Sequence, residues 1–388
     1  MRAVSRPPVV VGVIAAAVAA ACGRIGYDDL DVDAAVPIDF TETPCDTPVK
    51  IVNLGASVTP APAATAYALD VAATATGLVA AWNVGGNEVQ VTGVAVDSAG
   101  RVGLLQPAAC VLETPSTALA AAAIDDDVIL AIDDGGQIQL HDLDGHGYQR
   151  GDVAYLDTKR GFGHEFITAD PARDHFVVVG TNGTATYALT VDHDGDELTA
   201  PGAVLPAATE VPEGVAVALR GADYAVMSGT SGQCELRTVD ASFAPVSAPR
   251  QVAMTCHHAS VVTPPGSANV LGAWNCDNDS VWVVAGDPTI TLPAERAVFG
   301  DSSMSASNPR VVVTSAGVWY AYQVVGGRLG RALLGADGNP VSGGEPVDAH
   351  QSAQLVAYDL VARADRAFLV WIESGSEDDL WAMRLCAP

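Results

Sequence analysis

The chain has 388 residues and a formal net charge of −27, with 17% charged and 49% hydrophobic residues. This composition excludes a disordered chain, because it supplies ample apolar material for a core. The acidic balance disfavours nucleic acid and anionic membrane surfaces as partners, since binding to phosphate groups requires cationic side chains. The 38 glycines and 23 prolines indicate a globular protein rich in turns.

Residues 1–21 have the pattern of a secretory signal peptide. Arg2 and Arg6 precede an apolar run, Val9–Ala21, that is too short to cross about 30 Å of hydrocarbon as a helix. The run ends in Ala-Ala-Ala-Cys22, which resembles the lipobox of bacterial lipoproteins. The resemblance implies a lipid anchor on Cys22, and Gly23 after it implies the outer membrane, with the protein facing the periplasm or the cell surface. The alternative is an ordinary signal peptide in which the cysteine is incidental.

Residues 22–44 form an acidic segment without periodic apolar residues. Its composition, with Pro37 and Pro44, predicts a flexible tether that precedes a folded domain over residues 45–388. A single strand, Pro48–Leu54, is expected at the start of this domain.

Short apolar strands then recur with a nearly constant period. Gly77–Leu105 shows the unit: an apolar strand, a Gly/Asn turn, an alternating strand, an Asp-Ser-Ala-Gly turn and a final short strand. Candidate second strands end at spacings of 50, 48, 48, 46, 48 and 49 residues. They are Leu78–Trp82, Val128–Ile132, Phe176–Gly180, Tyr224–Ser228, Val270–Trp274, Val318–Tyr322 and Ala367–Trp371.

The turn after the third strand of each unit gives the same period. We expect these turns at Asp97, Asp142, Asp192, Asp240, Asp287 and Gly335. A period near 48 with four short strands per unit predicts an all-β fold, a seven-bladed β-propeller of four-stranded antiparallel blades. Its first strands, such as Ala118–Ile124, are built from small residues, as expected around a central channel.

The seventh unit ends at its third strand, Leu380–Cys386, so no chain remains for a fourth. Pro48–Leu54 can supply that strand and close the ring without an exposed edge. This closure brings Cys45 close to Cys386, and an exported chain permits a disulfide between them. Cys256 and Cys276 lie opposite each other across one predicted hairpin and form a second expected pair. The pairing of Cys110 and Cys234 stays open.

The last unit also carries a recognisable strand pattern. Phe368-Leu-Val-Trp371, an acidic Gly-containing turn and Leu380-Trp-Ala-Met-Arg-Leu385 resemble a repeat of secreted bacterial surface proteins. In that repeat the two strands build propeller blades. The resemblance implies the propeller fold and a bacterial lipoprotein, but it brings no catalytic residues.

Two histidine- and aspartate-rich segments suggest metal sites at first sight. They are His141–His146 and Asp192–Glu197. The second lacks both the glycine at the sixth position and the glutamate at the twelfth position of a calcium loop. Both segments fall on the recurring turn, so we interpret them as hairpin turns and expect no metal and no cofactor.

Acidic and histidine side chains are expected around one face of the ring. First strands begin on the same face as the turns between second and third strands. The predicted rim consists of Asp133, Asp134, His164, His257, His258, Asp277, Asp279 and Asp378. We expect a monomeric, lipid-anchored binding or scaffold module for a protein or glycan partner, with no assigned catalytic residue. The alternative is a hydrolase or lyase that uses carboxylates and histidines of this rim.

Overall fold

The computed structural model describes most of the chain from Cys45 onward. The described residues are 45–55, 69–84, 88–104, 110–112, 118–133, 137–156, 163–181, 185–205, 214–230, 233–253, 257–275, 281–289, 296–299, 306–324, 328–342, 345–347, 354–374 and 378–387. The predicted signal peptide, the tether and Cys22 lie outside them. Within these ranges no helix is both long enough and apolar enough to cross a membrane.

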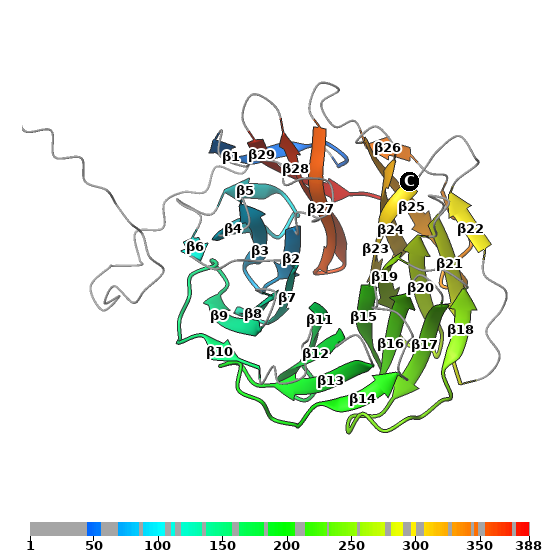
Figure 1. Ribbon diagram of the computed structural model, residues 1–388. Helices are drawn as coiled ribbons and strands as arrows, with labels where there is room; N and C mark the ends of the chain where they lie inside the picture. The colour runs from blue at the N-terminus through cyan, green and yellow to red at the C-terminus, as the bar shows by residue number, and fades with distance from the viewer. Residues whose placement is uncertain are drawn as a thin grey trace, which may run out of the picture.

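The strands form seven antiparallel sheets arranged as blades around a central axis (Figure 1). The innermost strands contact one another in ring order, β2, β7, β11, β15, β19, β23 and β27, and β27 returns to β2. The fold is therefore the predicted seven-bladed β-propeller. One blade carries an addition, because the short strand β6 (Cys110–Leu112) also pairs with β4.

The strand bounds follow the order of the blades. Blade 1 comprises β2 (Leu69–Ala73), β3 (Gly77–Val84), β4 (Glu88–Val96) and β5 (Val102–Leu104). Blade 2 comprises β7 (Ala118–Ile124), β8 (Asp127–Asp133), β9 (Ile138–Asp144) and β10 (Ala154–Tyr155). Blade 3 comprises β11 (Gly163–Asp170), β12 (His175–Thr181), β13 (Thr186–Val191) and β14 (Gly202–Leu205). Blade 4 comprises β15 (Gly214–Arg220), β16 (Asp223–Thr230), β17 (Gln233–Val239) and β18 (Arg250–Ala253).

The remaining blades complete the ring. Blade 5 comprises β19 (His257–Val262), β20 (Val270–Asn275), β21 (Val281–Gly286) and β22 (Arg296–Phe299). Blade 6 comprises β23 (Ala306–Thr314), β24 (Gly317–Val324), β25 (Arg328–Leu334) and β26 (Glu345–Val347). Blade 7 comprises β27 (Gln354–Arg363), β28 (Arg366–Ser374), β29 (Asp378–Leu385) and the N-terminal strand β1 (Val49–Gly55). All seven predicted second strands lie within their observed counterparts.

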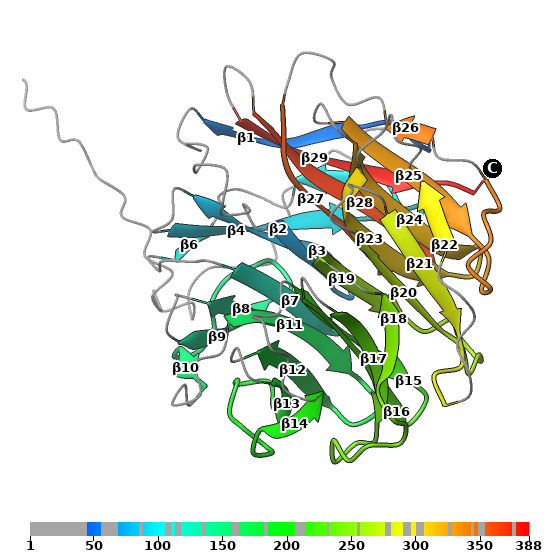
Figure 2. The ribbon, with the colours of Figure 1, turned by 45° about the vertical axis from the view of Figure 1, so that its right-hand side comes forward.

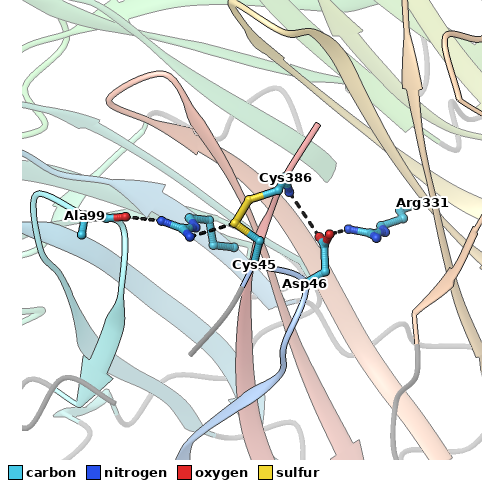
Figure 3. The surroundings of a disulfide bond; sticks show 6 residues. Cys45, Asp46, Ala99, Arg331 and Cys386 are labelled. Carbon is cyan, nitrogen blue, oxygen red and sulfur yellow. Dashed lines mark hydrogen bonds and ion pairs between the residues drawn. A yellow bond between two sulfur atoms is a disulfide. The ribbon is translucent and has the colours of Figure 1, made fainter. Parts of the chain in front are cut away.

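The N-terminal strand closes the ring as predicted. β1 pairs antiparallel with β29, with Val49 opposite Ala382 and Asn53 opposite Asp379 (Figure 2). A disulfide joins Cys45 to Cys386, whose Cα atoms are 5.6 Å apart (Figure 3). Antiparallel pairing places the start of β1 beside the end of β29, which is why the two cysteines meet. Both the closing strand and this disulfide are thus confirmed.

The core consists of apolar layers between neighbouring blades. Among the described residues, seven clusters of buried side chains occur, one at each interface between adjacent blades. Trp82, Trp274 and Trp371 are completely buried near the ends of their second strands. Burying both faces of each sheet explains why the second strands are continuously apolar rather than alternating.

One predicted turn was wrong in position. In blade 2 the turn begins at Asp144, whose carbonyl accepts a hydrogen bond from Gly147 N–H, because β9 continues through Asp142 opposite Ile129. The buried Asp142 carboxylate binds Arg150, 2.6 Å from Nη2, instead of starting a turn. With Asp144 in place, successive turns are 47, 48, 48, 47 and 48 residues apart, so the repeat is more regular than expected.

Aspartate side chains build these turns. The Asp192 Oδ1 atom accepts hydrogen bonds from the backbone N–H groups of Asp194 and Asp196, and Asp240 Oδ1 makes the same bonds to Ser242 and Ala244. The segment Asp192–Glu197 is therefore a hairpin turn, and the segment His141–His146 consists of the end of β9 and the turn that follows it. Local turn chemistry accounts for part of the large aspartate content.

Candidate functional site

Three charged residues occupy equivalent positions on the inner strands of blades 6, 7 and 1. Asp70 pairs with Ala81, Arg310 with Ala321 and Asp359 with Val370. In each blade the partner is the residue just before the last aromatic residue of the second strand, so the three charged residues belong to one level of the ring. We call Asp70, Arg310 and Asp359 the inner charge cluster.

The two carboxylates of the inner charge cluster meet at one backbone amide. Val71 N–H donates to Asp359 Oδ2 at 2.9 Å and to Asp70 Oδ1 at 3.1 Å. Asp70 Oδ2 also accepts from Ala121 N–H in blade 2 at 2.6 Å, and Arg310 Nε lies 3.2 Å from Asp359 Oδ1. All four carboxylate oxygens therefore have partners, and the cluster links four consecutive blades, from blade 6 to blade 2.

The protonation of Asp70 is perturbed by this environment. Burial raises the pKa of Asp70 well above its usual value, and the neighbouring charge of Asp359 raises it further. Arg310 and the Ala121 N–H act in the opposite direction but do not cancel these effects. Asp70 can thus hold a proton that a solvated aspartate would lose.

The predicted rim lies on the face where inner strands begin, which we call the upper face. There the first residue of β7, Ala118, pairs with the last residue of β8, Asp133. Asp133 itself is buried, with 5% of its surface exposed, so it is not a free rim carboxylate. His258 is exposed near the start of β19.

The other predicted rim residues are only partly described. His257 and Asp378 are the first residues of β19 and β29, and His164 is the second residue of β11, but their side chains lie outside the described part. Asp134, Asp277 and Asp279 lie outside the described residues altogether, as do Cys256 and Cys276. Cys234 is disulfide-bonded, with a partner whose side chain is not among those described. Within the described residues, no group of three His, Cys, Asp or Glu side chains is arranged to hold a metal ion.

The upper ends of several inner strands are irregular. β11, β19, β23 and β27 each carry a register shift near their first residues. In two of them a non-glycine residue has a positive φ, 48° at His258 and 51° at Asn308. The Tyr358 hydroxyl of the next blade donates to the Asn308 carbonyl and supports that conformation. Bulges of this kind redirect side chains, and backbone strain of this kind is concentrated at functional sites.

Polar contacts on the opposite, lower face join neighbouring blades. His193 of blade 3 lies between two carboxylates, with Nδ1 2.9 Å from Asp127 of blade 2 and Nε2 3.0 Å from Asp174. Desolvation lowers the pKa of His193, but the hydrogen bonds to Asp174 and Asp127 outweigh it, so the net pKa is raised. Between blades 3 and 4, the Tyr224 hydroxyl donates to Asp170 at 2.7 Å. These clusters have the geometry of structural links between blades.

Sequence reasoning missed the inner charge cluster, although a signal was present. Asp70 and Asp359 each stand twelve residues before a tryptophan of a second strand, Trp82 and Trp371. An aspartate at the same position of two inner strands indicates that the two side chains lie at one level of the ring.

Comparison with known proteins identifies the architecture alone. No family model matches the chain, and no curated protein does. Solved structures similar to it include the WD40 domain of a coronin from Toxoplasma gondii, with TM-score 0.55 and 12% identity over 90% of this chain and 89% of that one. BBS1N, solved in complex with ARL6DN, has TM-score 0.55 and 12% identity over 86% of this chain and 97% of that one. Hydrazine synthase of Kuenenia stuttgartiensis has TM-score 0.55 and 12% identity over 82% of this chain and 98% of that one. At such identities the likeness shows a propeller, a framework suited to binding and scaffolding, and nothing about its ligand.

Proposed function

We propose that this protein is a lipid-anchored, extracytoplasmic binding module that presents the upper face of its propeller to a protein or glycan partner. The observation that supports this face most directly is His258, an exposed non-glycine residue held in the left-handed conformation at a β-bulge. Such a conformation costs on the order of 1 kcal/mol. Because bulges recur at the upper ends of several inner strands, we give them the role of directing side chains outward.

The carboxylates at the channel support binding rather than hydrolysis. A general acid must reach its substrate, but both oxygens of Asp359 are held by other blades, and Asp70 accepts hydrogen bonds from Val71 N–H of its own strand and from Ala121 N–H of blade 2. The side chain of Asp359 is only 7% exposed. The raised pKa of Asp70 is explained by its burial beside the charge of Asp359, so we assign no catalytic step to it.

The upper-face proposal is tested by site-specific photo-crosslinking in intact cells. A photoreactive phenylalanine analogue at position 258 should give a discrete adduct with a partner from the envelope. The same analogue in place of Val246, which is 46% exposed on the lower face, is the matched control. Glycosidase and protease digestion of the adduct then tell a glycan from a protein. Absence of an adduct at position 258, or the same adduct from both positions, would contradict the proposal.

The lipid anchor is tested separately. The sequence supports it through the apolar run that ends at Cys22. The Cys22→Ser variant should leave the membrane fraction and lose labelling by a fatty-acid analogue. Unchanged partition and labelling would exclude an anchor on this residue without affecting the proposal about the upper face.

A further inference from the structure

A pocket of about 250 Å³ lies where the chain ends of the ring meet. Its walls come from the lower ends of blades 6 and 7 and from the closing disulfide. Its lining includes Thr314, Trp319, Asp365, Arg366, Arg384 and the disulfide of Cys45 and Cys386. The pocket is therefore distant in the fold from the upper face.

Two arginine side chains converge in this pocket. A Cβ atom built on Gly100, in a turn of blade 1, would lie 2.8 Å from Arg366 Cδ and 2.8 Å from Arg384 Cδ. Both stems thus pack on the same turn, where Gly100 has no side chain and a φ of 79°. Any other residue at this position would occupy the space that the two arginines use.

Neither guanidinium makes a hydrogen bond or ion pair with a carboxylate among the described residues, although the pKa of Asp365, in the same lining, is lowered by its hydrogen bonds to Ser315 and also by the charge of Arg366. Arg384 donates to the Ala99 carbonyl and to Cys45 Sγ, the latter at 2.8 Å, and sulfur is a weak acceptor (Figure 3). Arg366 makes no hydrogen bond or ion pair to any described residue. The neighbouring Asp365 is directed to Ser315, accepting from its N–H and its hydroxyl.

Half of the twelve arginines whose side chains are described lack an ion pair with a described carboxylate, so the convergence of two such arginines is what distinguishes this pocket. Six other arginines pair with aspartates: Arg101, Arg150, Arg173, Arg220, Arg310 and Arg331. The pKa of Arg363, on the same hairpin, is lowered by desolvation, and the charge of Arg366 contributes to that lowering. The lining carries two arginines against one carboxylate, Asp365, which is held by Ser315, although acidic residues outnumber basic ones 46 to 19 in the chain. An anion is the missing complement.

We propose that this pocket binds a small organic oxyanion, a carboxylate, sulfate or phosphate of about monosaccharide size, through Arg366 and Arg384. The planar guanidinium groups suit the oxygen pairs of such groups. Thr314 and Trp319 also line the pocket. The proposal is independent of the upper-face partner, because it concerns other residues on another face.

Arginine modification tests the site in the unaltered protein. Phenylglyoxal should modify Arg366 and Arg384 readily, and saturating glucuronate or inorganic phosphate should slow both reactions at least tenfold, as followed by peptide mass spectrometry. Arg328, exposed at the start of β25 on the upper face, is the internal control and should react at an unchanged rate. Lack of protection by both probes, or equal slowing at Arg328, would overturn the proposal.

A variant pair supplies a second measurement. Arg366→Gln breaks no hydrogen bond of the described structure, so it should fold normally. Glucuronate should raise the thermal midpoint of the wild type and of Arg328→Gln, but not that of Arg366→Gln. General effects of the salt on stability are common to all three proteins. Equal stabilisation of Arg366→Gln would refute a site at these arginines.

Discussion

The disulfide between Cys45 and Cys386 should be a major source of stability, because it ties both ends of the ring. The cysteines are 341 residues apart, and the chain-entropy relation gives about 6 kcal/mol for closing a loop of this length. Losses measured on removing native disulfides are about 2–5 kcal/mol. The unfolding entropy of a ring of this size is roughly 0.7 kcal/mol/K, so the double variant Cys45→Ser/Cys386→Ser should melt about 3–8 °C below the wild type.

Thermal and urea unfolding under non-reducing conditions provide the assay. The variant should also show a steeper dependence on urea, because its unfolded chain is free to expand and exposes more surface. Lys50→Gln is the matched control on the same seam. It removes the ion pair with Asp379, and Lys50 is 43% exposed, so a change within about 1 kcal/mol is expected. A midpoint for the double variant within about 1 °C of the wild type would refute the reasoning.

Three further predictions concern individual blades. His193→Gln should destabilise the protein most below about pH 6.5, where the wild-type histidine is charged in both the folded and the unfolded state. The difference in unfolding free energy between variant and wild type should shrink as pH rises through the raised folded-state pKa. A difference that stays constant with pH would contradict the link between blades 2 and 3. Asp70→Asn should raise the thermal midpoint at pH 8, because the amide keeps the Ala121 hydrogen bond without the charge. The gain should disappear below about pH 3.8, where wild-type Asp70 is protonated folded or unfolded, and a lower midpoint at pH 8 would count against the account. Ile51→Ala in β1 should lower the free energy of unfolding, measured in urea, by about 2–5 kcal/mol, since Ile51 is 6% exposed and packs in the core between blades 1 and 7. A loss below about 1 kcal/mol would mean that β1 adds little to the stability of the ring.

The architecture could be predicted because its signals repeat. A second strand that must be apolar on both faces recurs in each unit, so chance matches cannot imitate the period. Closure followed from counting strands, since the last unit lacked one and Pro48–Leu54 had no neighbour. The turn of blade 2 was predicted at Asp142 instead of Asp144, two residues later. Sequence spacing alone could not show that Asp142 lies inside β9 and binds Arg150.

The site was harder to predict, because its residues meet only through the ring. Asp70 and Asp359 are 289 positions apart and become neighbours once blade 7 docks beside blade 1. Of the predicted rim, Asp133 turned out to be buried, and His258 is exposed with a backbone conformation that no sequence pattern announced. Arg366 and Arg384 belong to one repeat, yet their convergence depends on Gly100 of another.

The seam between blades 7 and 1 is the interface at which the two ends of the chain meet. Blade 7 is built from both ends of the chain: β1 is followed directly by β2 of blade 1, whereas five other blades separate β27, β28 and β29 from blade 1 along the chain. Apolar layers alone would leave the register of blade 7 weakly specified. Directional contacts therefore fix it: Asp359 binds Val71 N–H, Arg363 Nε binds the Thr74 carbonyl at 2.7 Å, and β1 pairs along β29. Once the seam is fixed, both faces of the ring are rigid, and a partner on the upper face or an anion at Arg366 would meet side chains already held in place.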